Sequence, residues 1–123
     1  MGHTWVEVEI SDLEKKHAER VNALVDTGAT LTVLPKELAD RLGIMPVSEA
    51  DVQTGAGRIK LKKGEARVKI KDKEGPVIVL ISEIIDKVLL GVVALESLGF
   101  EVDPTTETLK PATLLLYALG LDK

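Results

Sequence analysis

Apolar and polar residues alternate along much of the chain, as they do in strands that have one buried face. The alternation is regular over residues 4–10, where valine and isoleucine alternate with tryptophan and glutamate. The same reasoning predicts further strands over residues 18–25, 31–34, 47–53, 59–63, 65–71, 76–82 and 87–91, and an extended segment over 100–104. Turn residues separate these segments at close intervals, which favours an all-β barrel or sandwich.

Two short segments carry a helical pattern instead. Residues 35–42 begin with Pro35, which suits a first helical position, and they end before Gly43. Residues 92–98 predict a second helix that ends before a glycine. The final apolar run, residues 112–119, is too apolar to lie exposed, so we expect its own sheet or a partner chain to cover it.

Length and composition narrow the class of protein. A chain of 123 residues predicts one domain, residues 1–123, with a single core. A net charge of -4 gives no basis for a nucleic-acid partner, and no apolar run is long enough to predict a membrane partner. The first residues lack the apolar centre of a signal peptide, so a cytoplasmic location is expected. The absence of cysteine and the wide spacing of the two histidines predict no metal site and no cofactor.

The candidate chemistry lies in the stretch Val25-Asp26-Thr27-Gly28-Ala29, between two apolar runs. Asp26 is a single carboxylate at the end of a predicted buried strand, a setting in which carboxylates do chemistry. Gly28 allows the backbone to approach a ligand or a second chain closely, and Thr27 can hydrogen-bond across the turn. The alternative is a structural Asx-turn, in which Asp26 hydrogen-bonds only to its own backbone.

Two further motifs follow in the chain. Thr54-Gly55-Ala56-Gly57 forms the tip between two predicted alternating strands, which is typical of a β-hairpin. Taken alone it could be an ordinary hairpin tip, and it is not a phosphate loop because no Gly-Lys-Ser/Thr follows. Val88-Leu89-Leu90-Gly91 is a short buried strand directly before the second predicted helix.

In this order and spacing, the three motifs resemble those of the retropepsin-like (retroviral-type) aspartic proteases, in the single-lobe branch that includes microbial members. The resemblance implies a closed acid-protease barrel with one or two short helices, assembled as a homodimer. It also implies a role for each motif: catalysis by Asp26, a substrate-binding turn at Thr27, Gly28 and Ala29, a flap at Thr54, Gly55, Ala56 and Gly57, and support behind the turn from Leu90 and Gly91.

The chain departs from the retroviral pattern at two positions. Retroviral members usually have an aspartate and an arginine that pair where this chain has Thr30 and Val92. Both partners of that ion pair are missing together, so neither charge is left alone. This difference indicates another branch of the family, since the Asp-Thr-Gly triplet itself is intact.

The number of triplets decides how such an enzyme must be built. The chain has eight aspartates, and only Asp26 stands in an Asp-Thr-Gly triplet. An aspartic protease needs two carboxylates, so the resemblance implies a homodimeric endopeptidase in which two Asp26 side chains activate a water against a peptide or unfolded protein. Two alternatives remain open: a non-catalytic dimeric module that binds peptides or assembles a complex, and an oligomerising structural domain without a ligand.

Overall fold

The computed structural model describes residues 3–112, which form nine strands and two short helices. In chain order these are β1 Thr4–Ser11, β2 Ala18–Val25, β3 Thr32–Pro35, α1 Lys36–Arg41, β4 Ser48–Thr54, β5 Gly57–Ile70, β6 Lys73–Ser82, β7 Val88–Leu90, α2 Val92–Ser97, β8 Phe100–Asp103 and β9 Thr108–Pro111. No helix in this part of the chain is long and apolar enough to cross a membrane.

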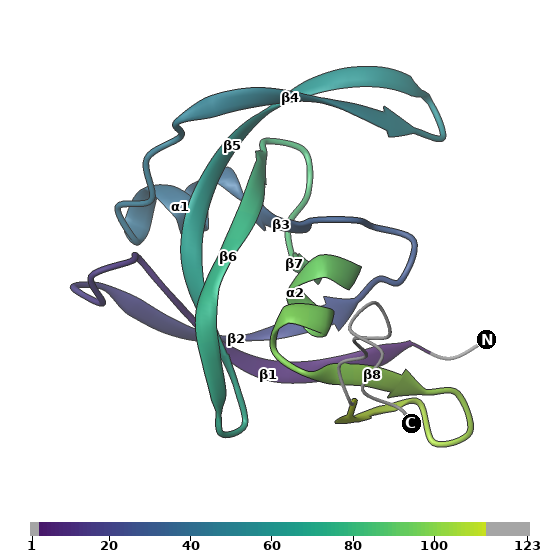
Figure 1. Cartoon of the computed structure of the whole chain (residues 1–123). Helices are drawn as coiled ribbons and strands as arrows, with labels where there is room; N and C mark the ends of the chain where they lie inside the picture. Colours follow the sequence, from purple (N-terminus) through teal and green to yellow (C-terminus); the bar gives the residue numbers. More distant parts are fainter. Residues whose placement is uncertain (1–2, 113–123) are drawn as a thin grey trace, which may run out of the picture.

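Six of the strands close into a barrel, in the order β1-β2-β7-β3-β6-β5, and β1 pairs with β5 to complete the ring. The β2–β7 and β3–β6 pairs are parallel, and the other pairs in the ring are antiparallel. Strand β4 pairs with β5 alone, so the β4–β5 hairpin projects beyond the barrel (Figure 1). The predicted all-β closed barrel with two short helices is confirmed.

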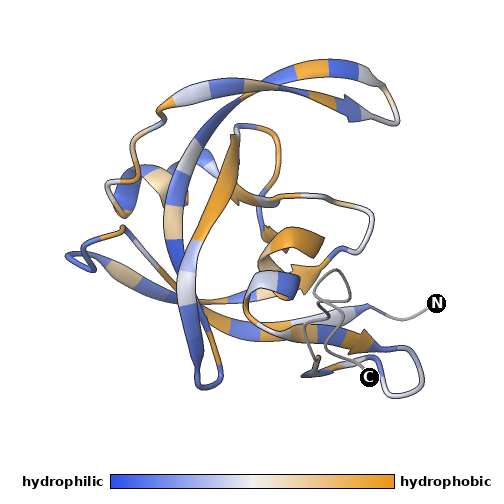
Figure 2. Cartoon of the chain, in the orientation of Figure 1, coloured by the Kyte–Doolittle hydropathy of each residue, from blue (hydrophilic) through white to orange (hydrophobic). Residues whose placement is uncertain are grey.

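The barrel encloses an aliphatic core that follows from the alternation in the sequence. Every second residue at the end of β5 is fully buried, as are Val8 and Ile10 of β1. The middle of β6 is a continuous apolar run, and Figure 2 contrasts it with the alternating colours of the β4–β5 hairpin. Each helix buries two residues against the barrel, Leu38 and Ala39 in α1 and Ala94 and Leu95 in α2. Each large aliphatic side chain buried this way contributes about 1.5–3 kcal/mol.

One strand is longer than the sequence pattern predicted. Residues 59–63 and 65–71 were expected to be separate strands, but β5 runs unbroken through Gly64. Gly64 is buried, and a Cβ there would lie 3.1 Å from the carbonyl oxygen of Met45, so the glycine admits a neighbouring backbone. On one side of it the even-numbered residues face the core, and on the other side they are exposed. The strand therefore serves as barrel wall and then as an arm of the projecting hairpin.

Smaller corrections concern the ends of elements. Pro35 is the last residue of β3 and the N-cap of α1, so the first helix begins one residue later than expected. The extended segment after α2 is a paired strand, β8, bonded to β9. The apolar run 112–119 lies outside the described residues except for Ala112, whose N–H donates to the carbonyl oxygen of Gly99.

Candidate active site

Asp26 directly follows β2 at a turn that uses both its backbone and its side chain. Its N–H donates to the carbonyl oxygen of Leu90 (2.9 Å), and its own carbonyl accepts the N–H of Ala29 (3.0 Å). Its Oδ1 accepts the N–H of Gly28 (2.9 Å), which is the geometry of an Asx-turn. Asp26 is half-buried, while Thr27 and Gly28 are exposed. The Asx-turn thus orients the carboxylate without removing it from the surface, so the two interpretations of Asp26 are compatible.

The turn rests on the backbone of β7 and α2. Val92 donates its N–H to the carbonyl of Ala29 (2.9 Å), and Val93 donates to the carbonyl of Thr30 (3.0 Å). Where retroviral members have an ion pair, Thr30 and Val92 therefore lie in segments joined by backbone hydrogen bonds. These bonds do not depend on side-chain charge, so the loss of both charged residues leaves the two segments connected.

Gly91 is the closest point of this contact. A Cβ at this position would lie 2.5 Å from the carbonyl carbon of Leu31 and 2.8 Å from the carbonyl oxygen of Thr30, so only glycine fits. Leu90 and Gly91 thus lie directly against the turn, where the sequence interpretation expected them.

Thr32 is a site residue that the sequence interpretation missed. Its side chain is fully buried, and its Oγ1 accepts the N–H of Gly91 (3.1 Å). This bond gives a partner to a backbone N–H that would otherwise be buried without one. The signal was present, because Thr32 is a polar residue inside the apolar run 31–34.

The predicted flap is the β4–β5 hairpin. Thr54 pairs with Gly57 across the tip, and Gly55 and Ala56 form the turn between them. Gly57 has a φ of +122°, which favours glycine. The tip lies on the same side of the molecule as the turn that follows β2 (Figure 1). The structure therefore places the Asp-Thr-Gly turn and the predicted flap on one side of the barrel.

Two cross-strand ion pairs connect the arms of this hairpin. Lys60 pairs with Asp51 and Lys62 pairs with Glu49, each at 3.1 Å, and all four side chains are exposed. Exposed pairs of this kind contribute about 0.2–1 kcal/mol each. They favour the strand register and make the surface of the hairpin hydrophilic.

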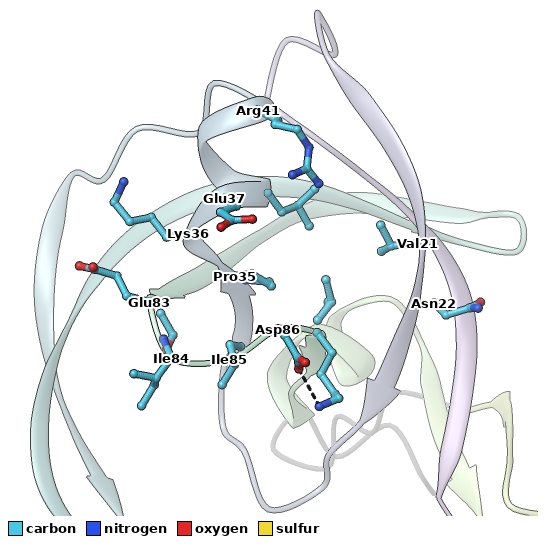
Figure 3. A pocket seen from close by; sticks show the side chains of 14 residues that line it. Val21, Asn22, Pro35, Lys36, Glu37, Arg41, Glu83, Ile84, Ile85 and Asp86 are labelled. Carbon is cyan, nitrogen blue, oxygen red and sulfur yellow. Dashed lines mark hydrogen bonds and ion pairs between the residues drawn. The ribbon is translucent and has the colours of Figure 1, made fainter.

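A cavity with a volume of about 590 Å³ lies elsewhere in the described part of the chain. It is bounded by β2, the start of α1 and the segment between β6 and β7 (Figure 3). Its lining includes no residue of the Asp-Thr-Gly turn or of the flap tip. Three of the cations that line it are paired: Lys36 with Asp40, Arg41 with Glu19 and Lys87 with Asp86. The hydrogen bond from Lys87 lowers the pKa of Asp86, which keeps that carboxylate ionised.

The cavity lies away from the Asp-Thr-Gly turn and the flap tip, and we assign the candidate chemistry to the turn at Asp26. Among residues 3–112, no group of three or more histidine, aspartate or glutamate side chains could hold a metal ion.

Comparisons with known proteins agree with this geometry. Residues 13–97 match the family model described as gag-polyprotein putative aspartyl protease, a range that includes Asp26, the flap tip and Gly91. None of the curated proteins matches the sequence.

Several solved structures share the fold. The EIAV protease complexed with the inhibitor HBY-793 is 21% identical, with a TM-score of 0.62 over 94% of each chain. The simian foamy virus (mac) protease is 25% identical, with a TM-score of 0.51 over 72% of this chain and 87% of that one. The foamy viral protease-reverse transcriptase, solved in complex with an RNA/DNA hybrid, is 18% identical, with a TM-score of 0.56 over 90% of this chain and 13% of that one. With the family match over most of its length, the chain belongs to the retropepsin-like family of gag-polyprotein aspartyl proteases.

Proposed function

We propose that this protein is an aspartic endopeptidase that works as a homodimer, in which each subunit contributes one Asp26. The observation that carries the proposal is the single Asp-Thr-Gly turn, with a half-buried carboxylate oriented by the N–H of Gly28. Family membership supports the reaction class. The count of one triplet per chain supports the shared site, because peptide hydrolysis of this kind needs two carboxylates.

The chemistry follows from bringing two carboxyl groups together. Like charges at close range disfavour double ionisation, so the pair holds one proton between them. The ionised carboxylate takes a proton from a water molecule, whose oxygen attacks the carbonyl carbon of the peptide bond. The protonated carboxyl gives its proton to the carbonyl oxygen, and a tetrahedral diol forms.

Collapse of the diol completes the reaction. The carboxyl that received the water proton donates it to the peptide nitrogen, and the carbon–nitrogen bond breaks. A hydroxyl of the diol returns its proton to the other carboxylate, which leaves a carboxylic acid, an amine and the original pair. Because the two groups share their protons, the titration belongs to the pair and not to either Asp26 alone.

Neighbouring residues take supporting roles in this proposal. Thr27, exposed at the turn, would hydrogen-bond across the two-fold axis to the other subunit. The backbone at Gly28 would meet a substrate that adds itself as an extended strand. The tip from Thr54 to Gly57 would close over the peptide and exclude water. A site shared by two chains has only half of its walls in one chain, so a cavity of the single chain need not mark it.

We expect the protein to hydrolyse peptide bonds in acidic solution, and the barrel to remain folded there. A hydrogen bond from Arg41 lowers the pKa of Glu19, and one from Lys15 lowers the pKa of Glu74. A carboxylate with a lowered folded pKa stabilises the fold above its unfolded value of about 4.5, and the effect disappears as pH falls through the folded value. Thermal unfolding measured against pH should therefore show the stability falling only below about pH 4.5.

The test is the substitution Asp26→Asn, which keeps the size of the side chain and removes its acid–base chemistry. Cleavage of an unstructured protein such as casein should fall by at least about 10³-fold, while the unfolding midpoint and the dimer survive. Asp72→Asn, at the exposed β5–β6 turn, is the matched control and should cleave at the wild-type rate. Retained cleavage in Asp26→Asn would refute the assignment. A wild-type protein that binds pepstatin or casein but cleaves no peptide bond at any pH would be a binding module instead.

A further inference from the structure

We propose that Thr54 is the positioning residue of the flap, and that its hydroxyl fixes the backbone of the tip in the conformation that receives a peptide. The inference rests on the proposed function, because it assigns to this hairpin the task of covering a bound chain. It adds a residue whose side chain acts through the neighbouring backbone and not by touching the scissile bond.

The hydroxyl of Thr54 joins both sides of the tip. Its Oγ1 accepts the N–H of Ala56 at 3.1 Å and donates to the carbonyl oxygen of Gly57 at 2.7 Å. Serine and threonine form such local bonds to the backbone two residues ahead in turns. Here the same oxygen also reaches the first residue of the opposite arm, so one side chain closes the whole loop.

Other restraints on the tip are few. A Cβ on Gly55 or on Gly57 would find no heavy atom within 4 Å, so nothing packs against the turn at these two positions. Glycine also has more backbone freedom to lose than any other residue, and the tip contains two. The nearest cross-strand ion pair, Lys60 with Asp51, lies on the arms and not at the turn. Besides the backbone pairing of Thr54 with Gly57 and a hydrogen bond from Gln53 Nε2 to the carbonyl oxygen of Thr54 (3.2 Å), the Thr54 hydroxyl is the local constraint on which way the tip amides point.

This constraint matters for binding because a peptide binds only to the fraction of molecules whose tip is already shaped to receive it. If that fraction falls, the apparent affinity falls by the same factor. We expect the loss of these two hydrogen bonds to lower that fraction, and with it the affinity, by about tenfold.

The bonds of Thr54 stay within the tip, in contrast to the bond of Thr32, which connects two core segments. Removing the Thr54 hydroxyl should therefore leave the barrel as stable as before. A loss of binding without a loss of global stability is the signature of a positioning role.

The experiment compares Thr54→Val, which keeps the shape but lacks the hydroxyl, with Thr54→Ser, which keeps the hydroxyl. We expect kcat/KM of Thr54→Val to fall about tenfold, mainly through KM, and Thr54→Ser to stay within about twofold of wild type. Amide hydrogen exchange at Ala56, followed by NMR, should accelerate in the valine variant alone. Thr105→Val, at an exposed position in the β8–β9 turn, is the matched control and should change neither measurement.

The same variants combined with Asp26→Asn separate this inference from the proposed function. Casein affinity, measured by titration calorimetry in that background, where the proposed function predicts no cleavage, should fall about tenfold for Thr54→Val only. Unchanged casein affinity and unchanged Ala56 exchange in Thr54→Val would overturn the role of Thr54, whatever the protein cleaves. A serine variant as impaired as the valine variant would overturn it too, because the hydroxyl would then not be the cause. Failure of Asp26→Asn to abolish cleavage would overturn the proposed function alone.

Discussion

The turn at Asp26 and the flap are fixed in the fold by different means. The turn is held by backbone hydrogen bonds to residues more than sixty positions later in the chain: the carbonyl of Leu90 accepts one, and the N–H groups of Val92 and Val93 donate the others. The flap is held only within one hairpin, by the antiparallel pairing of β4 with β5, by a hydroxyl that bonds within three residues and by exposed ion pairs between the two strands. The first arrangement depends on the whole barrel, and the second is local to one hairpin.

This difference matches what each region must do in the proposed reaction. A catalytic carboxylate has to stay within a fraction of an ångström of its place, and close-packed backbone holds it there with little dependence on side-chain identity. A flap must open and close around a peptide, so weak contacts that re-form after each opening suit it better. Variants that weaken each region should therefore affect different measurements.

The largest expected effect is at Gly91. Gly91→Ala would place a Cβ 2.5 Å from the carbonyl carbon of Leu31. No side-chain rotation relieves this clash, because the atom it meets belongs to the backbone. We expect a loss of about 3 kcal/mol or more in the free energy of unfolding, measured by urea denaturation. Gly55→Ala in the flap tip meets nothing within 4 Å and should change stability by less than about 0.5 kcal/mol. Equal losses of unfolding free energy in Gly91→Ala and Gly55→Ala would contradict the proposed difference between the turn and the flap.

A smaller effect is expected at Thr32. Thr32→Val preserves the shape of the buried side chain but leaves the N–H of Gly91 without its acceptor. An unpaired buried donor costs about 1–3 kcal/mol, which denaturant unfolding should register. Thr32→Ser, which keeps the hydroxyl, should recover the part of this loss that comes from the hydrogen bond. A valine variant as stable as wild type would show that this bond does not support the turn.

The smallest effect is expected in the ion pairs of the flap. Lys60→Gln removes one exposed pair, and such pairs contribute at most about 1 kcal/mol. The unfolding midpoint of Lys60→Gln should not differ measurably from that of the wild type. In the wild type, which keeps the pair, KM should change by less than about twofold between low and high salt. A large shift in the unfolding midpoint would mean that the flap is coupled to the core after all.

The same contrast explains which features the sequence could predict. The flap was located from its own residues, because alternation and a glycine-bearing tip are local signals. The barrel followed from the alternation of β1, β2 and the end of β5, and Asp26 from its triplet. Residues 59–63 and 65–71 were predicted as separate strands, because the backbone that Gly64 admits, at Met45, is distant in the sequence. Thr32 was missed for the same reason, since its partner Gly91 is 59 residues away.

The shared carboxylate pair is tested most directly by mixing subunits. Wild-type and Asp26→Asn chains, unfolded together and refolded in equal amounts, should form dimers at random, so about one quarter would carry two carboxylates. We predict that activity per total protein falls to about one quarter of the wild-type value and follows the square of the wild-type fraction at other ratios. An activity of about one half, in linear proportion to the wild-type fraction, would show that each chain works alone and would contradict the two-chain site.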